Sequence, residues 1–163
     1  MNDSLKTIIV DDEALARRGL RYRLADTPDI ELVGEARNGR EALKLIDELA
    51  PDLVFLDIQM PGMDGFDVMR ALNEDDMPAI VFVTAFDEYA VQAFEANALD
   101  YLLKPIEDER LAEALERVRK LKDQKRALKH KSSLLKLVGQ ITGESVRSMK
   151  DIREKGVSRM KKA

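Results

Sequence analysis

Five polar residues each lie just after a short apolar stretch of the sequence, and their side chains could together do chemistry. They are Asp11, Asp12, Asp57, Thr84 and Lys104. Three carboxylates in one crevice repel one another and raise one another's pKa, unless a cation compensates their charge. An aspartate nucleophile, a metal ion, a hydroxyl group and an ammonium group are the components of a phosphoryl-transfer site with an aspartyl-phosphate intermediate.

Asp57 is the candidate for the nucleophile. An apolar run of strand length, residues 53–56, ends at this carboxylate, and a loop containing Pro61, Gly62 and Gly65 follows. Such a pattern indicates a buried strand that delivers an acid to a surface crevice.

Magnesium is the cation that suits three carboxylates at such a site. Mg²⁺ takes oxygen ligands and retains several waters, which suits Asp12 and Asp57 as ligands and Asp11 as a partner of metal-bound waters. Thr84 and Lys104 would bind the oxygens of a transferred phosphoryl group. Singly, each residue also has a structural explanation, such as capping a helix or forming a turn. Their occurrence together favours the phosphoryl-transfer site.

The elements that must position these residues alternate between strand and helix. Apolar runs predict strands, and residues at helical spacing follow each of them; the expected strands are 7–10, 30–36, 53–56, 79–83 and 100–103. The alternation predicts an α/β fold, a doubly wound five-stranded parallel sheet with helices on both faces. Right-handed crossovers favour the strand order 2-1-3-4-5. Ligands bind outside the carboxyl ends of such strands, where all five polar residues fall.

Composition excludes several classes of protein. The 163 residues contain no cysteine, so disulfides and thiol chemistry are absent. No apolar run approaches the roughly 18 to 20 residues that a membrane span needs, and the polar start of the chain does not resemble a secretory signal. We therefore expect a cytoplasmic protein.

Four motifs carry a resemblance to a known family. They are VDDE at 10–13, FLDIQMPGMDG at 55–65, VTA at 83–85 and DYLLKP at 100–105. In this order they resemble the response-regulator receiver domains of bacterial two-component signalling, over residues 5 to about 120. The resemblance implies a flavodoxin-like fold and a phosphorylation-dependent signalling receiver, which is not an enzyme beyond its own phosphorylation and dephosphorylation. The stretch TAFDEYAVQAFEANALDYLLKP further resembles receivers of LytR/AlgR-type regulators, whose usual output is a LytTR DNA-binding domain.

The resemblance assigns a role to each residue of the acidic cluster. Asp57 would accept a phosphoryl group from a sensor histidine kinase. Asp12, Asp57 and the backbone carbonyl of Gln59 would bind Mg²⁺, and Asp11 would complete the acidic pocket.

The resemblance also implies a switch. Thr84 and Lys104 would bind the phosphoryl group, and the space that Thr84 vacates would let Tyr101 turn inward. This movement would reshape the face made by the fourth helix, the fifth strand and the fifth helix. We expect a homodimer through that face and through the extended terminal helix. The bond between Lys104 and Pro105 is expected to be a cis peptide.

Two positions bear on the lifetime of the aspartyl phosphate. Gln59 lies two residues beyond Asp57, and Phe86 lies two residues beyond Thr84. Side chains at these positions can gate the water that hydrolyses the acyl phosphate. The bulky Phe86 suggests slow or moderate self-dephosphorylation.

The end of the chain departs from the resemblance and is strongly basic. Residues 1–106 carry 10 Lys and Arg against 22 Asp and Glu, a net charge of −12, whereas residues 107–163 carry 17 against 9, a net charge of +8. We expect a receiver domain at 1–122 and a basic helical extension at 123–163. The extension is either an overlong terminal helix or a coiled-coil arm of a dimer. It is too short to bury a second core, so it would pack on a partner chain or be partly disordered.

Smaller features of the extension also carry expectations. A stripe of apolar residues continues the terminal helix past the body, and Gly139 and Gly143 predict a break within the extension. The remaining residues are too few for a LytTR domain, which would need about another 100 residues.

Two other function classes compete with a signalling receiver. One is a DNA-binding transcriptional regulator of LytTR type, represented by a shortened chain or binding DNA through its basic tail. The tail has no helix-turn-helix pattern and no aromatic residue follows Tyr101, which counts against sequence-specific readout. The other is a metal-dependent phosphatase, which is disfavoured because Gln59 is not a second acid that could protonate a leaving group.

Overall fold

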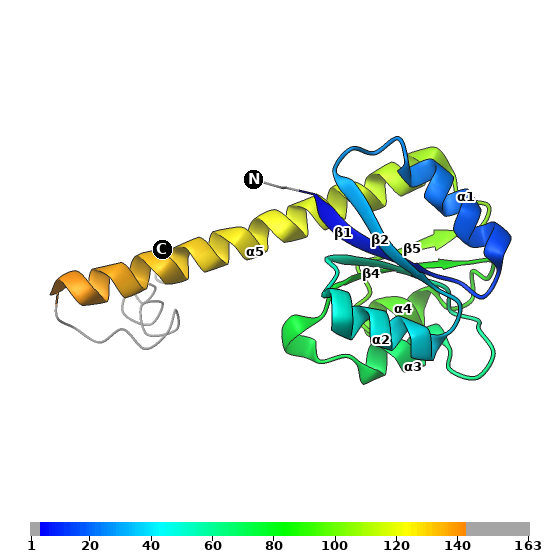
Figure 1. The fold of residues 1–163 in the computed structure, drawn as a ribbon, viewed down its shortest axis with the longest axis horizontal. Helices are drawn as coiled ribbons and strands as arrows, with labels where there is room; N and C mark the ends of the chain where they lie inside the picture. The colour runs from blue at the N-terminus through cyan, green and yellow to red at the C-terminus, as the bar shows by residue number, and fades with distance from the viewer. Residues whose placement is uncertain (1–3, 143–163) are drawn as a thin grey trace. The chain divides into compact units, whose positions relative to one another are not determined.

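The structure is a computed structural model that describes residues 4–142 of the chain. Its strands and helices alternate as the sequence predicts (Figure 1), in the order β1 (Leu5–Val10), α1 (Ala14–Leu24), β2 (Ile30–Ala36), α2 (Gly39–Leu49), β3 (Leu53–Leu56), α3 (Gly65–Ala71), η1 (Glu74–Asp76), β4 (Ala79–Thr84), α4 (Ala90–Glu95), β5 (Asp100–Leu103) and α5 (Asp108–Thr142). The short 3₁₀ turn η1 was not predicted. For all five strands, the predicted first and last residues differ by at most two positions from the observed ones.

The sheet confirms the predicted fold class and strand order. Its five strands are all parallel and lie in the order β2-β1-β3-β4-β5. Figure 1 shows α1 on one side of the sheet and α2, α3 and α4 on the other. β1 and β3 are neighbours at the centre, so the residues that follow them meet at the same edge of the sheet.

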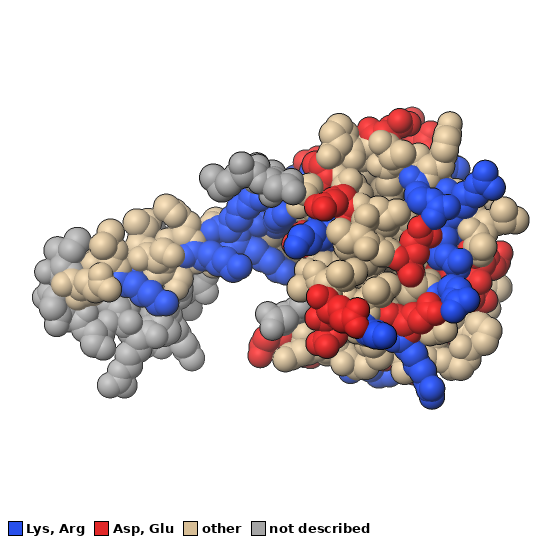
Figure 2. Space-filling model, in the orientation of Figure 1, with Lys and Arg blue, Asp and Glu red and all other residues tan. Residues whose placement is uncertain are grey.

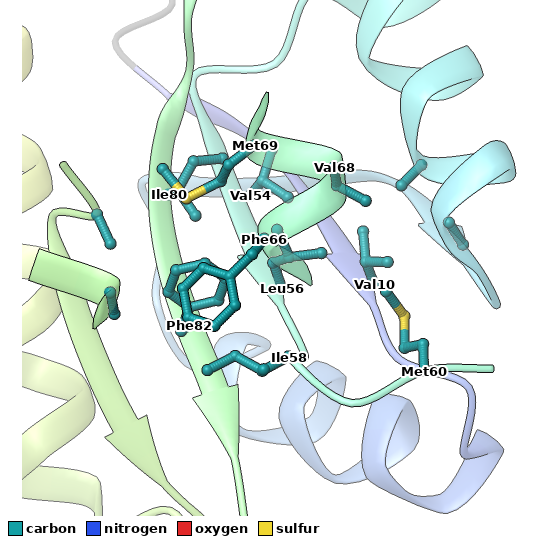
Figure 3. Close-up of a cluster of buried hydrophobic side chains, with 14 of the residues drawn as sticks. Val10, Val54, Leu56, Ile58, Met60, Phe66, Val68, Met69, Ile80 and Phe82 are labelled. Atoms are coloured by element: carbon teal, nitrogen blue, oxygen red, sulfur yellow. The ribbon is translucent and has the colours of Figure 1, made fainter. Parts of the chain in front are cut away.

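Strands β3 and β4, which both lie inside the sheet, are buried along their whole length. Helices cover both faces of a doubly wound sheet, which is why these strands are apolar without alternation. Figure 3 shows a cluster of buried apolar side chains in the core, where Phe66 and Met69 of α3 pack beside Phe82 and Ile80 of β4. The rings of Phe66 and Phe82 lie 5.1 Å apart at their centroids. This packing fixes α3, and with it the loop that follows β3.

Local signals in the sequence set where α3 begins. Asp64 and Asp67 form a capping box, in which each side chain accepts a hydrogen bond from the other's main-chain N–H. Gly65 is required by close approach, because a Cβ atom there would lie 2.6 Å from the carbonyl oxygen of Asp57. The glycine therefore lets α3 start directly against the end of β3 and keeps the intervening loop tight.

A buried ion-pair cluster fastens the first turns of α5 to β5. The Asp100 carboxylate is only 1% exposed. Arg110 Nη2 lies 2.7 Å from Asp100 Oδ1, and Arg117 Nη1 lies 3.2 Å from Asp100 Oδ2. Arg110 also donates to the main-chain carbonyl oxygen of Tyr101 at 3.0 Å. Two guanidinium groups thus compensate one buried carboxylate.

The chain divides into a compact unit, 1–118, and a second unit, 119–163. In the second unit α5 continues to Thr142, and residues 119–131 carry seven Lys and Arg against one Asp, which Figure 2 shows as a basic stretch of this helix. Gly139 lies inside α5, which continues to Thr142, so the break that the two glycines bracket does not occur at Gly139. One glycine costs a helix only about 1 kcal/mol, which good helix formers around it offset. Gly143 and the rest of the predicted extension lie outside the described residues.

Among the described helices, none combines the length and the apolar character that crossing a membrane requires.

Candidate functional site

Three of the candidate residues meet at the carboxyl edge of the sheet. Asp11 follows β1, Asp57 follows β3 and Lys104 follows β5. The main-chain N–H of Asp57 donates to the Val10 carbonyl oxygen at 2.9 Å, which continues the β1–β3 pairing into the site. Lys104 Nζ lies 2.7 Å from Asp11 Oδ2 and 3.3 Å from Asp57 Oδ2. The lysine therefore bridges two carboxylates that are 4% and 5% exposed.

Asp12 completes a cluster of acidic groups that suits a hard cation. One carboxylate oxygen from each of Asp11, Asp12 and Asp57 lies within 4.8 Å of the other two. Asp12 is exposed, so the cluster opens to solvent on its side. Carboxylate oxygens in such an open arrangement are the ligand type that Mg²⁺ takes, with room for metal-bound waters.

Burial and the neighbouring charges perturb the ionisation of this site. Burial raises the pKa of Asp57 to about 6, while Lys104 opposes the shift and Asp11 adds to it. For Lys104, burial lowers the pKa, but the hydrogen bonds and charges of Asp11 and Asp57 outweigh it, and the pKa is raised overall. At neutral pH the site therefore holds an ammonium group beside an ionised Asp57 that is poorly solvated.

Thr84 and Tyr101 are both hydrogen-bonded to the main chain of Phe86. Thr84 is fully buried, and its hydroxyl oxygen accepts a long hydrogen bond of 3.4 Å from the main-chain N–H of Phe86. The Tyr101 side chain is buried, and its hydroxyl donates to the Phe86 carbonyl oxygen. Burial raises the pKa of Tyr101, and a main-chain hydrogen bond from Tyr89 opposes the shift. Tyr101 already lies in the inward position that the predicted switch assigns to the phosphorylated protein.

The peptide bond between Lys104 and Pro105 is cis. The main-chain N–H of Lys104 donates to the Thr84 carbonyl oxygen at 2.8 Å, which extends the β4–β5 pairing to the last residue before the proline.

Residues 7–116 match the family model described as the response regulator receiver domain. The chain belongs to the response regulator receiver family. Receivers are signalling modules rather than enzymes.

Individual relatives agree with this family. The chain is 53% identical over 115 residues to the transcriptional regulatory protein BtsR of Salmonella typhi, an alignment that covers 71% of this chain and 48% of that protein. It is 51% identical over 114 residues to an uncharacterized response regulatory protein of Vibrio cholerae, covering 70% of this chain and 48% of that protein. The chain thus spans about half the length of the curated relatives it matches.

A solved receiver structure shows the same fold. The receiver domain of AraT, a response regulator from Geobacillus stearothermophilus, superposes with a TM-score of 0.68 at 36% identity, covering 75% of this chain and 98% of that one.

The receiver site also contains residues that the sequence did not reveal. Arg17 of α1 donates from Nη1 to the main-chain carbonyl oxygen of Asp11 at 2.6 Å, and its Nε lies 3.6 Å from Glu35 Oε1 on β2. Arg17 thereby holds the loop that carries the acidic pair against the neighbouring strand. The sequence shows Arg17 only as a polar position of a predicted helix, because its partners lie on other elements.

Gln59 also makes a contact that links the site to another element of the fold. Its main-chain N–H donates to Asp57 Oδ1 at 3.3 Å, and its side-chain Nε2 donates to the hydroxyl of Tyr89 at 2.8 Å. The sequence places Tyr89 only on the apolar face of a predicted helix. Its partner is 30 positions away, so no local spacing could have revealed the pair.

Proposed function

We propose that this receiver accepts a phosphoryl group on Asp57 from a sensor histidine kinase. The observation that carries the proposal is the contact of Lys104 with both Asp11 and Asp57, at the edge of the sheet where the acidic cluster opens to solvent. An Asp57 oxygen attacks phosphorus, the bond from phosphorus to the kinase's histidine nitrogen breaks, and the imidazole, which is protonated on its other nitrogen, leaves with the bonding electron pair. The product is an aspartyl phosphate and a neutral histidine.

The other residues of the site act on the phosphoryl oxygens. Lys104 is already at the carboxylate and can hold a phosphoryl oxygen through a charge-assisted hydrogen bond. The Thr84 hydroxyl can donate to another, because only a long hydrogen bond holds it where it lies.

The donor set of the acidic cluster fits Mg²⁺. Asp12, Asp57 and the main-chain carbonyl of Gln59 would hold the ion, with Asp11 bonding to metal-bound waters. When bound, Mg²⁺ supplies positive charge that neutralises the phosphoryl oxygens.

The output we propose is a change in the face made by α4, β5 and α5. Movement of Thr84 toward the phosphoryl group acts on Phe86, to which both Thr84 and Tyr101 are bonded. Exposed apolar side chains lie on this face: Val91 and Phe94 of α4 and Leu103 of β5 are 71%, 53% and 46% exposed. Burial of such side chains favours a homodimer. The extended α5 would contribute to the same dimer.

We also propose that the protein regulates transcription, as LytR/AlgR-type regulators do. The motif stretch from Thr84 to Pro105 supports it, as does the similarity to BtsR, a protein named as a transcriptional regulator. The basic stretch 119–131 also suits the phosphates of DNA. Retention of labelled DNA by the whole chain, but not by residues 1–122, would support direct DNA binding.

Mass spectrometry after incubation with acetyl phosphate and Mg²⁺ tests the central claim. The wild-type chain should gain one phosphoryl group, and Asp57→Asn should gain none. Asp26→Asn, which changes an exposed carboxylate after α1, is the matched control and should behave as wild type. The proposal fails if wild type gains no phosphoryl mass, or if Asp57→Asn gains as much.

A further inference from the structure

The hydrogen bond between Gln59 and Tyr89 joins the loop after the phosphorylated strand to the start of α4. Gln59 lies two residues after Asp57, and its Nε2 is 2.8 Å from the Tyr89 hydroxyl oxygen. Tyr89 is the residue that precedes the first turn of α4, and its carbonyl oxygen accepts the main-chain N–H of Ala93 at 2.9 Å. A side chain next to the nucleophile is thus tied to a helix of the proposed output face.

The tyrosine ring is held in place independently of its hydroxyl. Its centroid lies 6.2 Å from that of Phe66 and 6.2 Å from that of Phe86, with edge-on geometry in both pairs. Aromatic pairs of this geometry contribute beyond the area they bury. Replacing Tyr89 by phenylalanine should therefore keep the ring where it is and remove only the hydrogen bond.

The bond lies at an open groove next to the site. Gln59 and Tyr89 both line this groove of about 570 Å³, together with Pro61, Phe66 and Gln92. Water can therefore reach the neighbourhood of Gln59. A glutamine carboxamide can accept a hydrogen bond from one water and orient it.

We propose that Tyr89 is a positioning residue that sets the lifetime of the aspartyl phosphate, by engaging the Gln59 carboxamide. This inference rests on the proposed function. Hydrolysis requires a water oxygen to attack phosphorus while the bond from phosphorus to the Asp57 oxygen breaks. The products are the Asp57 carboxylate and inorganic phosphate, which takes up the proton of the attacking water. The bond from Gln59 Nε2 to the Tyr89 hydroxyl leaves the carboxamide oxygen as an acceptor but fixes the carboxamide in one orientation, so it cannot turn to orient that water.

The test compares phosphoryl lifetimes in a double-mutant cycle. Wild type, Tyr89→Phe, Gln59→Leu and the double variant are labelled with acetyl phosphate and Mg²⁺, freed of reagent and followed by mass spectrometry. Tyr89→Phe should lose its phosphoryl group about three- to tenfold faster than wild type, the factor that one hydrogen bond of ordinary net strength corresponds to. In the Gln59→Leu background, Tyr89→Phe should change the lifetime less than about 1.5-fold, because the carboxamide is gone.

Gln92→Ala is the matched control, because Gln92 lines the same groove from the next turn of α4. It should keep the wild-type lifetime. Thermal unfolding of each variant shows that the fold is retained.

The possible failures are distinguishable. If no variant gains a phosphoryl group at Asp57, the proposed function falls, and this inference falls with it. If labelling is normal but Tyr89→Phe has the wild-type lifetime, this inference alone is wrong. Equal acceleration by Tyr89→Phe with and without Gln59 would also overturn it, because the ring would then act through packing and not through the carboxamide.

Discussion

Asp57 should destabilise the folded receiver when it is ionised and no cation is bound. Its side chain is almost completely buried, and burial is the main reason that its pKa is about 6 in place of 3.8. Asp57→Asn keeps the shape of the side chain and removes the charge. Lys104 retains its ion pair with Asp11 at 2.7 Å in the variant, so the lysine is not left without a partner. The substitution should therefore stabilise the fold.

The size and sign of the effect follow from linkage between protonation and folding. The pKa difference between about 6 and 3.8 corresponds to about 3 kcal/mol at a pH well above both values. The folded chain holds this proton more tightly than the unfolded chain, so the stability of the wild type falls relative to Asp57→Asn as the pH rises from about 4 through about 6. The expected advantage of the variant is ~1.5 kcal/mol at pH 5 and about 3 kcal/mol at pH 7.5.

Urea denaturation measures this difference in the free energy of unfolding between Asp57→Asn and wild type. The experiment is run with a chelator at a series of pH values between about 5 and 8. Asp26→Asn serves as the control and should show no comparable pH-dependent gain, since Asp26 is exposed. Adding Mg²⁺ should stabilise wild type more than Asp57→Asn, because a ligand stabilises only the state that binds it. An Asp57→Asn variant that is no more stable than wild type at pH 7.5 without Mg²⁺ would refute the reasoning.

Three further predictions concern residues around the site. Asp100→Asn should lower the free energy of unfolding in urea by about 1–3 kcal/mol, because the two arginines on α5 lose their buried counter-charge but remain partly solvated; an unchanged midpoint would contradict this role. Gly65→Ala should lower the melting temperature and slow labelling of Asp57 by acetyl phosphate, since the added Cβ meets a main-chain oxygen at 2.6 Å; wild-type values of both would show that the loop can yield. Lys104→Met should move the Asp57 carboxyl titration, followed by NMR without metal, to a pH above that of wild type, because the lysine charge lowers that pKa; a downward shift would exclude the proposed pairing.

The fold could be predicted because burial on both faces leaves a clear signal. Strands β3 and β4 read as uninterrupted apolar runs, and the polar residue that ends each run marks the carboxyl edge of the sheet. Parallel strands bring those ends together, so the sequence alone predicts that Asp11, Asp57 and Lys104 lie at one site. The contact of Lys104 with both carboxylates agrees with that placement.

Contacts between side chains that are far apart in the sequence could not be predicted in the same way. Arg17, Tyr89 and Asp100 each act through a partner on another element, and helix or strand periodicity says only which face a residue occupies. The break bracketed by Gly139 and Gly143 does not occur at Gly139, because the cost of one glycine is small against a long run of helix-forming residues.

The arrangement around Phe86 explains how charge at Asp57 could reach the output face in the proposed function. The acidic cluster and Lys104 together leave negative charge in excess, so a bound phosphoryl group requires additional donors as well as a cation. Thr84 is an uncharged donor among the predicted site residues, and the hydrogen bond that its hydroxyl oxygen accepts from the Phe86 N–H is long. Movement of Thr84 frees the Phe86 main chain on one side, while the Tyr101 hydroxyl holds it on the other. In the proposed function, Phe86 would then be held by the Tyr101 hydroxyl alone, which would couple Asp57 to β5 through a single residue.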